Sequence, residues 1–171
     1  VNLCQRKPKE TLMPLMQFVA RTLATATQAG DARAKFGALV VVTALDNTLK
    51  RSAAFRAQLE PMLRQYVVPE LASAHTLLRA MACLTLARYA DVAWTAPPAP
   101  EAAFAAALER VLALTHDPQL VVAAFAALSL KHLVQVPAGK ELLRPRLAEV
   151  FATFFRFIDL PDVDSDDMVM T

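Results

Sequence analysis

The sequence predicts an all-α protein made of stacked antiparallel helix pairs, and three observations lead to this fold class. Alanine and leucine dominate a chain of 171 residues that is 56% hydrophobic and contains only three glycines. The apolar residues recur at helical spacing, and the alternation of β-branched residues that is typical of strands is scarce. A helical pattern also repeats along the chain with a period of about 42 to 47 residues, which is typical of a solenoid.

The clearest helix pair lies between Leu59 and Arg88. A second helical run within it starts near His75, after a break at Pro69 and Ser73. Apolar residues cover too wide a face of this second helix for a surface position, so neighbouring helices must cover it on more than one side. The first helix has an apolar stripe at positions i, i+3, i+4, i+7 and i+8: Leu59, Met62, Leu63, Tyr66 and Val67.

A Leu-x-Pro-x-Leu/Met string marks the first helix of several units, with its proline at Pro14, Pro61 and Pro145. The intervals are 47 and 84 residues, and 84 is twice 42, so one unit between them lacks the proline. A proline inside a helix removes a hydrogen bond and kinks the helix, at a cost of about 3 kcal/mol. The three prolines are therefore expected to bend equivalent first helices, as in HEAT repeats.

This pattern predicts a HEAT-repeat α-solenoid of about three and a half stacked helix pairs in a single domain. The second helices superpose on Lys35, Arg79 and Leu120, and Thr95 to Pro100 forms a proline-rich connection. We interpret Lys35 and Arg79, near the turns between paired helices, as structural residues that bond between units. The expected units span residues 9–50, 57–92, 101–134 and 139–171, the last of them truncated.

The same interpretation extends to two aspartates, Asp31 and Asp117, at turns between paired helices. Gly30 is expected to end the first helix of the chain, which starts near Lys9, and Asp31 to cap the next helix, which reaches about Lys50.

Composition excludes several classes of protein. A net charge of +2, from 18 basic and 16 acidic residues spread along the chain, gives no electrostatic footprint for nucleic acid. The longest apolar runs, residues 36–45 and 120–130, are shorter than the ~18 to 20 residues of a membrane span, so they predict buried helices.

Cys4 and Cys83 are expected to be free buried thiols in a reducing compartment. A first residue other than methionine and an apolar end suggest a piece of a longer chain.

No catalytic, cofactor-binding or metal-binding constellation is recognisable, and we expect no enzyme. The three histidines are isolated, the glycines form no phosphate loop, and no serine has a paired base. The run from Asp162 to Asp167 matches positions 1, 3 and 5 of a calcium loop, but it lacks the glycine at position 6. An acidic helix N-terminus is the favoured interpretation of this run.

Several short strings carry a resemblance that is more specific than the fold. Their order and spacing resemble the central HEAT repeats of karyopherin-beta nuclear transport receptors, in the branch that contains importin seven and importin eight. The pattern departs from the family at Leu120, where a basic residue is usual, and at the inserted Thr95 to Pro100. A continuous ladder of polar contacts across the second and third units is therefore not expected. The strings include Lys9-Glu10-Thr11-Leu12, Lys35-x-Gly37-Ala38-Leu39, Val68-Pro69-Glu70-Leu71, Leu78-Arg79-Ala80-x-Ala82-Cys83, Lys140-Glu141 and Arg144-Pro145.

This resemblance implies a receptor that binds the GTP form of Ran and carries basic protein cargo such as ribosomal proteins and histones. It also implies passage along the phenylalanine-glycine nucleoporins, and shuttling between cytoplasm and nucleus. No cofactor, no direct contact with nucleic acid and no membrane are implied. The alternative is a structural HEAT scaffold or regulatory subunit that organises other proteins, which would not depend on Ran.

Two groups of aspartates are candidate partner-binding residues. Asp46 and Asp91 share late positions of the second helices with Asn47, Lys131 and His132, where either a binding row or a merely solvated face is possible. The second group lies at the turn into a second helix, and second helices line the inner curve in the family that the chain resembles, so it is placed to meet basic cargo. This group consists of Asp162, Asp164, Asp166 and Asp167.

Overall fold

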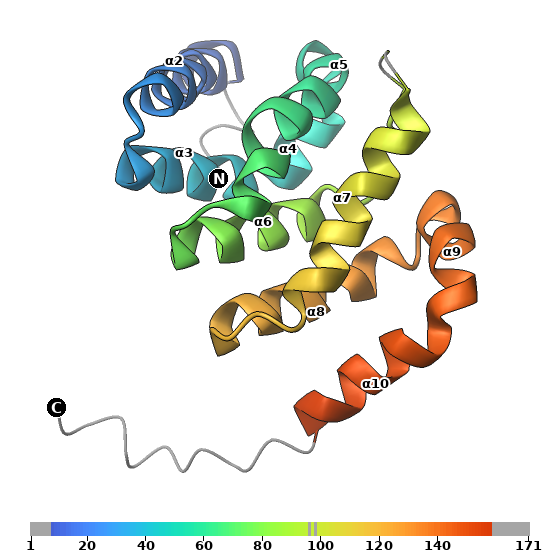
Figure 1. Cartoon of the computed structure of the whole chain (residues 1–171). Coiled ribbons are helices and arrows are strands. Elements are labelled where there is room, and N and C mark those ends of the chain that lie inside the picture. Colours follow the sequence, from blue (N-terminus) through green and yellow to red (C-terminus); the bar gives the residue numbers. More distant parts are fainter. Residues whose placement is uncertain (1–7, 96, 98, 159–171) are drawn as a thin grey trace, which may run out of the picture.

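A computed structural model of the chain describes residues 8–95, 97 and 99–158, and within these residues every regular element is a helix (Figure 1). The predicted all-α class is confirmed. The α-helices are α2 (Met13–Ala29), α3 (Ala32–Ala44), α4 (Asp46–Arg51), α5 (Ala53–Met62), α6 (Thr76–Arg88), α7 (Pro100–Leu114), α8 (Leu120–Leu133), α9 (Pro137–Leu143) and α10 (Leu147–Ile158). Short π-helical and 3-10 segments adjoin them: η1 (Pro8–Leu12), η2 (Leu63–Val67), η3 (Val68–Ala72) and η4 (Arg144–Arg146).

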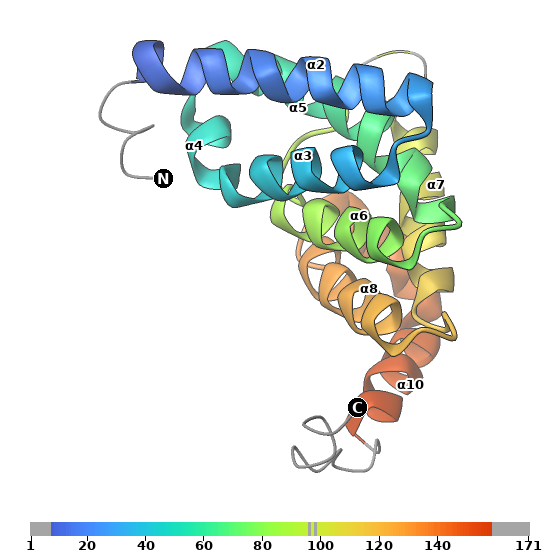
Figure 2. The same ribbon diagram turned by 90° about the vertical axis from the view of Figure 1, so that its left-hand side faces the viewer.

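The helices pack as stacked pairs, as HEAT-like repeats require. α2 packs on α3, α5 continues through η2 and η3 toward α6, and α7 packs on α8. The second helices α3, α6 and α8 lie side by side in one layer and run in the same direction (Figure 2). The assignment of four repeat units with the stated boundaries stays a prediction.

Each of the three repeated prolines lies where the helix type changes. Pro61 lies inside α5, and the chain turns π-helical and then 3-10 directly after it. Pro145 lies in the 3-10 segment between α9 and α10, and Pro14 lies in the first turn of α2, after the π-helical η1. A proline has no N–H to donate to the carbonyl four residues earlier, so the regular hydrogen-bond ladder changes there.

The core runs along the layer of second helices. α6 is covered by α3 on one side and by α8 on the other, as the width of its apolar face requires. Leu39 and Val42 of α3, Cys83 of α6 and Leu130 of α8 are each 0% exposed. Cys83 is a free thiol whose pKa burial raises to about 12, with a further contribution from the charge of Asp117.

The turn between α2 and α3 forms as the sequence predicts. Gly30 ends α2 in the left-handed conformation with φ of 68°, which glycine adopts without a steric cost. The side chain of Asp31 then accepts a hydrogen bond of 2.9 Å from the Ala34 N–H at the start of α3.

Within the described residues no single helix is both long and apolar enough to cross a membrane. Only α8 joined to Pro137–Arg156 across a bend of 113° reaches that length and composition.

Candidate partner-binding site

Polar contacts connect neighbouring helix pairs at the turns that precede the second helices. The Lys35 Nζ donates to Glu70 Oε1 at 2.6 Å. Arg79 Nε and Nη2 donate to the two carboxylate oxygens of Asp117 at 2.9 and 3.2 Å, and Arg79 Nη1 donates to the Ser73 carbonyl at 2.9 Å. The expected break in polar contacts between the second and third units is therefore wrong, because Arg79 and Asp117 join them.

The charge of Asp117 is stabilised where it lies. Its side chain is 7% exposed, and burial alone would raise the pKa of the carboxyl. Hydrogen bonds from Arg79 and from the Gln119 N–H, with the charge of Arg79, outweigh burial and lower this pKa below its usual value. At the position of α8 that corresponds to Lys35 and Arg79 lies Leu120, which is 53% exposed and has no polar side chain to make the same contact.

The short helix α4, which follows α3, and the late ends of α6 and α8 line a polar hollow of ≈ 550 Å³. The expected second helix from Asp31 to about Lys50 is wrong in this respect, because α3 ends at Ala44 and α4 begins at Asp46. The hollow brings together four residues of the predicted row, while Lys131 is exposed outside it. Sequence reasoning missed three further polar members, and each lies three residues from a predicted one, so extending the row by one helical turn would have found them. The four predicted residues are Asp46, Asn47, Asp91 and His132, and the three missed ones are Lys50, Arg88 and Gln135.

The hollow, referred to below as the polar hollow, carries charges of both signs. Lys50 Nζ pairs with Asp91 Oδ1 at 2.9 Å and donates to the Arg88 carbonyl at 3.0 Å, where it meets the negative end of the α6 dipole. Asp91 is exposed and available to a partner, with a side chain that is 67% exposed. Asp46 is 8% exposed and accepts from the Asn47 N–H, so it lies at the floor of the hollow.

Several side chains of the polar hollow are free to bond a partner. Asn47, Arg88 and Gln135 are exposed and His132 is half-buried, and within the described part of the chain none of these side chains has a hydrogen-bond partner. Two amides, a guanidinium and an imidazole together can donate to and accept from a polypeptide backbone. The site is thus suited to hydrogen bonding more than to attraction by a large net charge.

The acidic group Asp162, Asp164, Asp166 and Asp167 lies outside the described residues, so its proposed contact with basic cargo stays a prediction. Among the residues that are described, no group of three or more His, Cys, Asp or Glu side chains is arranged to hold a metal ion.

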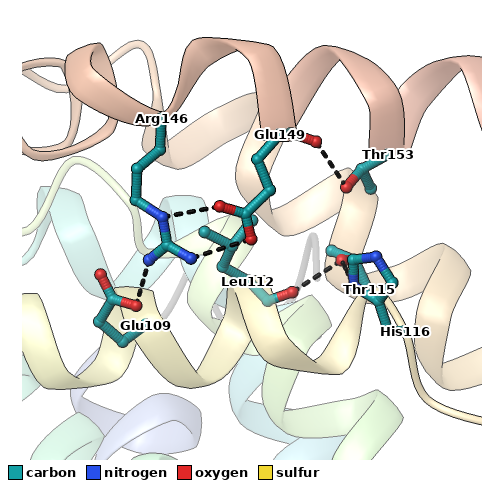
Figure 3. A network of polar contacts seen from close by, with 7 residues as sticks. All are labelled: Glu109, Leu112, Thr115, His116, Arg146, Glu149 and Thr153. Atoms are coloured by element: carbon teal, nitrogen blue, oxygen red, sulfur yellow. Dashed lines mark hydrogen bonds and ion pairs between the residues drawn. The ribbon is translucent and has the colours of Figure 1, made fainter.

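A second polar network joins α7 to α10 (Figure 3). Arg146 donates to both carboxylate oxygens of Glu149, at 2.8 and 2.9 Å, and also pairs with Glu109 of α7. These hydrogen bonds, that of Glu149 above all, raise the pKa of Arg146. Thr153 donates to the Glu149 carbonyl at 3.0 Å. Arg156 of α10 donates to the Thr115 carbonyl at the end of α7, so this network holds two successive first helices together.

A groove between α2 and α5, of ≈ 510 Å³, is mainly apolar. These two helices belong to successive units and leave the groove between them. Met13 and Met16 of α2 line it together with Phe55 and Met62 of α5 and Tyr66 of η2. Flexible thioethers and aromatic rings make a surface that adapts to an inserted apolar side chain.

Comparison with known proteins places this arrangement in a family. No family model and no solved structure matches the chain. It is 30% identical over 99% of its length to a probable importin-7 homolog of Dictyostelium discoideum and 27% identical over 99% to an importin beta-like SAD2 homolog of Arabidopsis thaliana. It is also 30% identical over 95% of its length to importin-8 of Danio rerio. The chain spans 15% to 16% of the length of these curated relatives. In sequence and in its stacked helix pairs, the chain belongs to the importin-beta family, in the branch of importin-7 and importin-8.

Proposed function

We propose that the chain forms part of the arch of a nuclear import receptor, which carries basic proteins, responds to the GTP form of Ran and passes between cytoplasm and nucleus. The observation that carries the proposal is the layer of three parallel second helices with the polar hollow across their ends. This layer occurs in a chain that matches importins over 95% or more of its length.

The polar hollow is the proposed contact with cargo. A solenoid offers an extended surface to which each unit contributes, and this hollow takes side chains from three units. A partner that lies in it therefore contacts all three units at once. Asp91 gives it one exposed carboxylate. The acidic group, which lies outside the described residues, is proposed as a further contact with basic cargo.

The strength of the contact between the acidic group and basic cargo can be bounded. An exposed ion pair contributes about 0.2 to 1 kcal/mol, so the four aspartates of the acidic group supply at most about 4 kcal/mol. That free energy corresponds to an affinity of about 1 mM. Cargo capture by the receptor therefore requires further contacts along the arch that act together with this one.

The apolar groove between α2 and α5 is the proposed contact with phenylalanine-glycine nucleoporins. A phenylalanine side chain is apolar and flat, and the methionine and aromatic lining of the groove can close around it. The polar hollow lies on the second helices, whereas this groove lies between first helices, so both contacts can be made at the same time.

The test uses the full-length parent protein with basic ribosomal proteins or histones as prey. We expect capture without Ran, release by Ran loaded with GTP, and no release by Ran loaded with GDP. Capture that is equal in all three conditions would favour the HEAT scaffold instead. Replacing the four aspartates of the acidic group by asparagine tests the cargo contact, and we expect weaker capture at low salt.

A further inference from the structure

A second hollow, referred to below as the tryptophan hollow, lies beside the polar hollow. It measures ≈ 520 Å³ and is lined mainly by apolar side chains from the segment after α6, the start of α7 and the region of α9. Trp94 is the only tryptophan of the chain, and its ring meets that of Phe104 edge to face at 5.5 Å and 68°. Pro100, Pro137 and Leu142 complete the apolar lining that the argument uses.

The two hollows adjoin. Val136 and Pro137 line both of them, so a single depression leads from α4 across the ends of α6 and α8 to α9. Val92 and Ala93, which line the tryptophan hollow, directly follow Asp91 of the polar hollow. One extended segment of a partner can therefore occupy both hollows, with an apolar side chain in one and polar groups in the other.

The tryptophan hollow is held in shape by a close backbone contact. A Cβ atom added to Gly139 would lie 2.1 Å from the Leu133 carbonyl oxygen, so α9 approaches the end of α8 as closely as only glycine allows. This approach fixes Pro137 and Leu142 opposite the segment of Trp94. Leu142 remains 40% exposed and Trp94 is half-buried, so the apolar lining is open to an inserted side chain.

Carboxylates lie on two sides of the tryptophan hollow, whereas the cations Lys50 and Arg88 line the polar hollow and not this one. Glu101 is the one charged residue that lines it within the described part of the chain, and it is exposed with no ion-pair partner there. On the side of the polar hollow, Asp91 is 67% exposed and pairs with Lys50 through Oδ1, which leaves Oδ2 open. A carboxylate on each side of an apolar hollow complements an apolar side chain with a cation on each side of it.

We propose that the tryptophan hollow holds one apolar anchor side chain of a partner polypeptide, whose flanking lysines or arginines meet Glu101 and Asp91. The inference rests on the proposed function, since it names the kind of segment that a basic cargo presents. Burying the anchor supplies most of the affinity, and the flanking charges supply selectivity.

Trp94 provides a direct readout because no other tryptophan contributes to the fluorescence of the chain. The probe is a pentapeptide with a central leucine and two lysines on each side, titrated into the 171-residue chain at low salt. We expect a blue shift of Trp94 emission and weaker quenching by acrylamide. Two control peptides replace the leucine by alanine or the lysines by glutamines, and we expect both to bind several-fold more weakly. No spectral change with the leucine peptide, or equal binding of the glutamine peptide, would overturn the proposal.

Three variants locate the binding. Glu101→Gln is expected to weaken binding of the leucine peptide by about two- to fivefold. Leu142→Lys removes apolar surface from the hollow and adds a positive charge that repels the lysines of the peptide. We expect the affinity for the leucine peptide to fall by more than about tenfold. Leu120→Lys is the matched control, because Leu120 is 53% exposed and lines neither hollow. Far-ultraviolet circular dichroism checks the fold of each, and an equal loss in Leu120→Lys would contradict the assigned site.

The peptide titration and the Ran experiment can fail independently of one another. If the full-length receptor releases cargo on binding Ran-GTP but Trp94 does not respond to the leucine peptide, the tryptophan hollow alone is wrongly assigned. If Trp94 responds and cargo capture ignores Ran, the hollow stands as a peptide site and the import function is wrong.

Discussion

The guanidinium of Arg79 holds the carboxylate of Asp117 through two hydrogen bonds, between residues that lie 38 positions apart in the sequence. Arg79 belongs to α6, and Asp117 lies in the turn that leads into α8. The side chains are 15% and 7% exposed, so the pair is shielded from solvent and binds one helix pair to the next.

Removing the arginine should destabilise the fold. Arg79→Ala leaves the buried carboxylate of Asp117 without its charged donors, and we expect the free energy of unfolding to fall by about 2 to 3 kcal/mol. Urea denaturation followed by circular dichroism measures this change. Arg110→Ala is the control, because Arg110 is exposed and has no partner in the described residues, and it should change stability by less than about 0.5 kcal/mol. Equal effects of both changes would contradict the prediction.

The contribution of Asp117 should depend on pH in one direction. Its pKa is lower in the folded protein than in the unfolded chain, so the ionised carboxylate stabilises the fold above the usual pKa of an aspartate, about 3.9. This contribution is lost as the pH falls through the folded pKa. The difference in unfolding free energy between the wild type and Asp117→Asn should thus be constant from pH 7 to about pH 5 and shrink below about pH 4. A difference that grows on acidification would show the opposite shift of the pKa.

The sequence predicts the helix layout well because each helix carries its own signals. Gly30 and Asp31 mark one turn through local backbone chemistry, and apolar spacing marks the helices on both sides. The sequence is less informative about which residues bond the basic side chains. Lys35 bonds Glu70, which lies at the end of a first helix, whereas Arg79 bonds Asp117 in a turn, so equivalent positions take partners at different distances along the chain.

The candidate site was predictable only in part. Asn47, Asp91 and His132 align in the sequence repeat and line one hollow, although Asn47 lies in α4, Asp91 follows α6 and His132 lies in α8. The tryptophan hollow depends on how closely α9 approaches α8, which is set by the contact of Gly139 with the Leu133 carbonyl. No periodic pattern in the sequence encodes that contact, because it arises between segments with different roles in the repeat.

Substitution by alanine should lower the stability of the fold at Gly139 and raise it at Gly37. Gly139→Ala would place a Cβ 2.1 Å from the Leu133 carbonyl oxygen, and the required shift should cost about 1 to 3 kcal/mol. Gly37 lies in α3 with no atom within 4 Å of an added Cβ, so Gly37→Ala should gain about 0.5 to 1 kcal/mol. Thermal denaturation of the two variants compares them directly. Destabilisation by Gly37→Ala would mean that this face of α3 is more crowded than the structure shows.

A buried hydroxyl pair joins α3 to α6. Thr43 and Thr85 approach to 2.8 Å between their Oγ1 atoms, and each Oγ1 also lies within hydrogen-bond distance of a carbonyl one turn earlier in its own helix. Each hydroxyl has a single hydrogen, so one threonine donates to the other, which donates to its own carbonyl. Either single change to valine should cost about 1 kcal/mol. The double variant should lose less than the sum, since neither hydroxyl is then left facing an apolar group. Strict additivity in this double-mutant cycle would show that the contact between the hydroxyls contributes no coupling.

The thiol of Cys83 should report on opening of the core. It is 0% exposed in α6, and burial, together with the charge of Asp117, raises its pKa to about 12, so the native thiol is both inaccessible and protonated at pH 8. In a Cys4→Ser background, modification by a disulfide reagent should require unfolding of α6. Rapid modification of the folded chain would contradict this expectation.

The rate of Cys83 modification also tests the contact between Arg79 and Asp117. If modification follows the population of the open state, a loss of about 2 to 3 kcal/mol in Arg79→Ala should accelerate it by about 30- to 140-fold, at a tenfold change per 1.4 kcal/mol. Arg110→Ala should leave the rate within about threefold of the parent. An unchanged rate in Arg79→Ala, with stability lowered in urea, would mean that α6 opens locally and independently of the contact that joins it to the next helix pair.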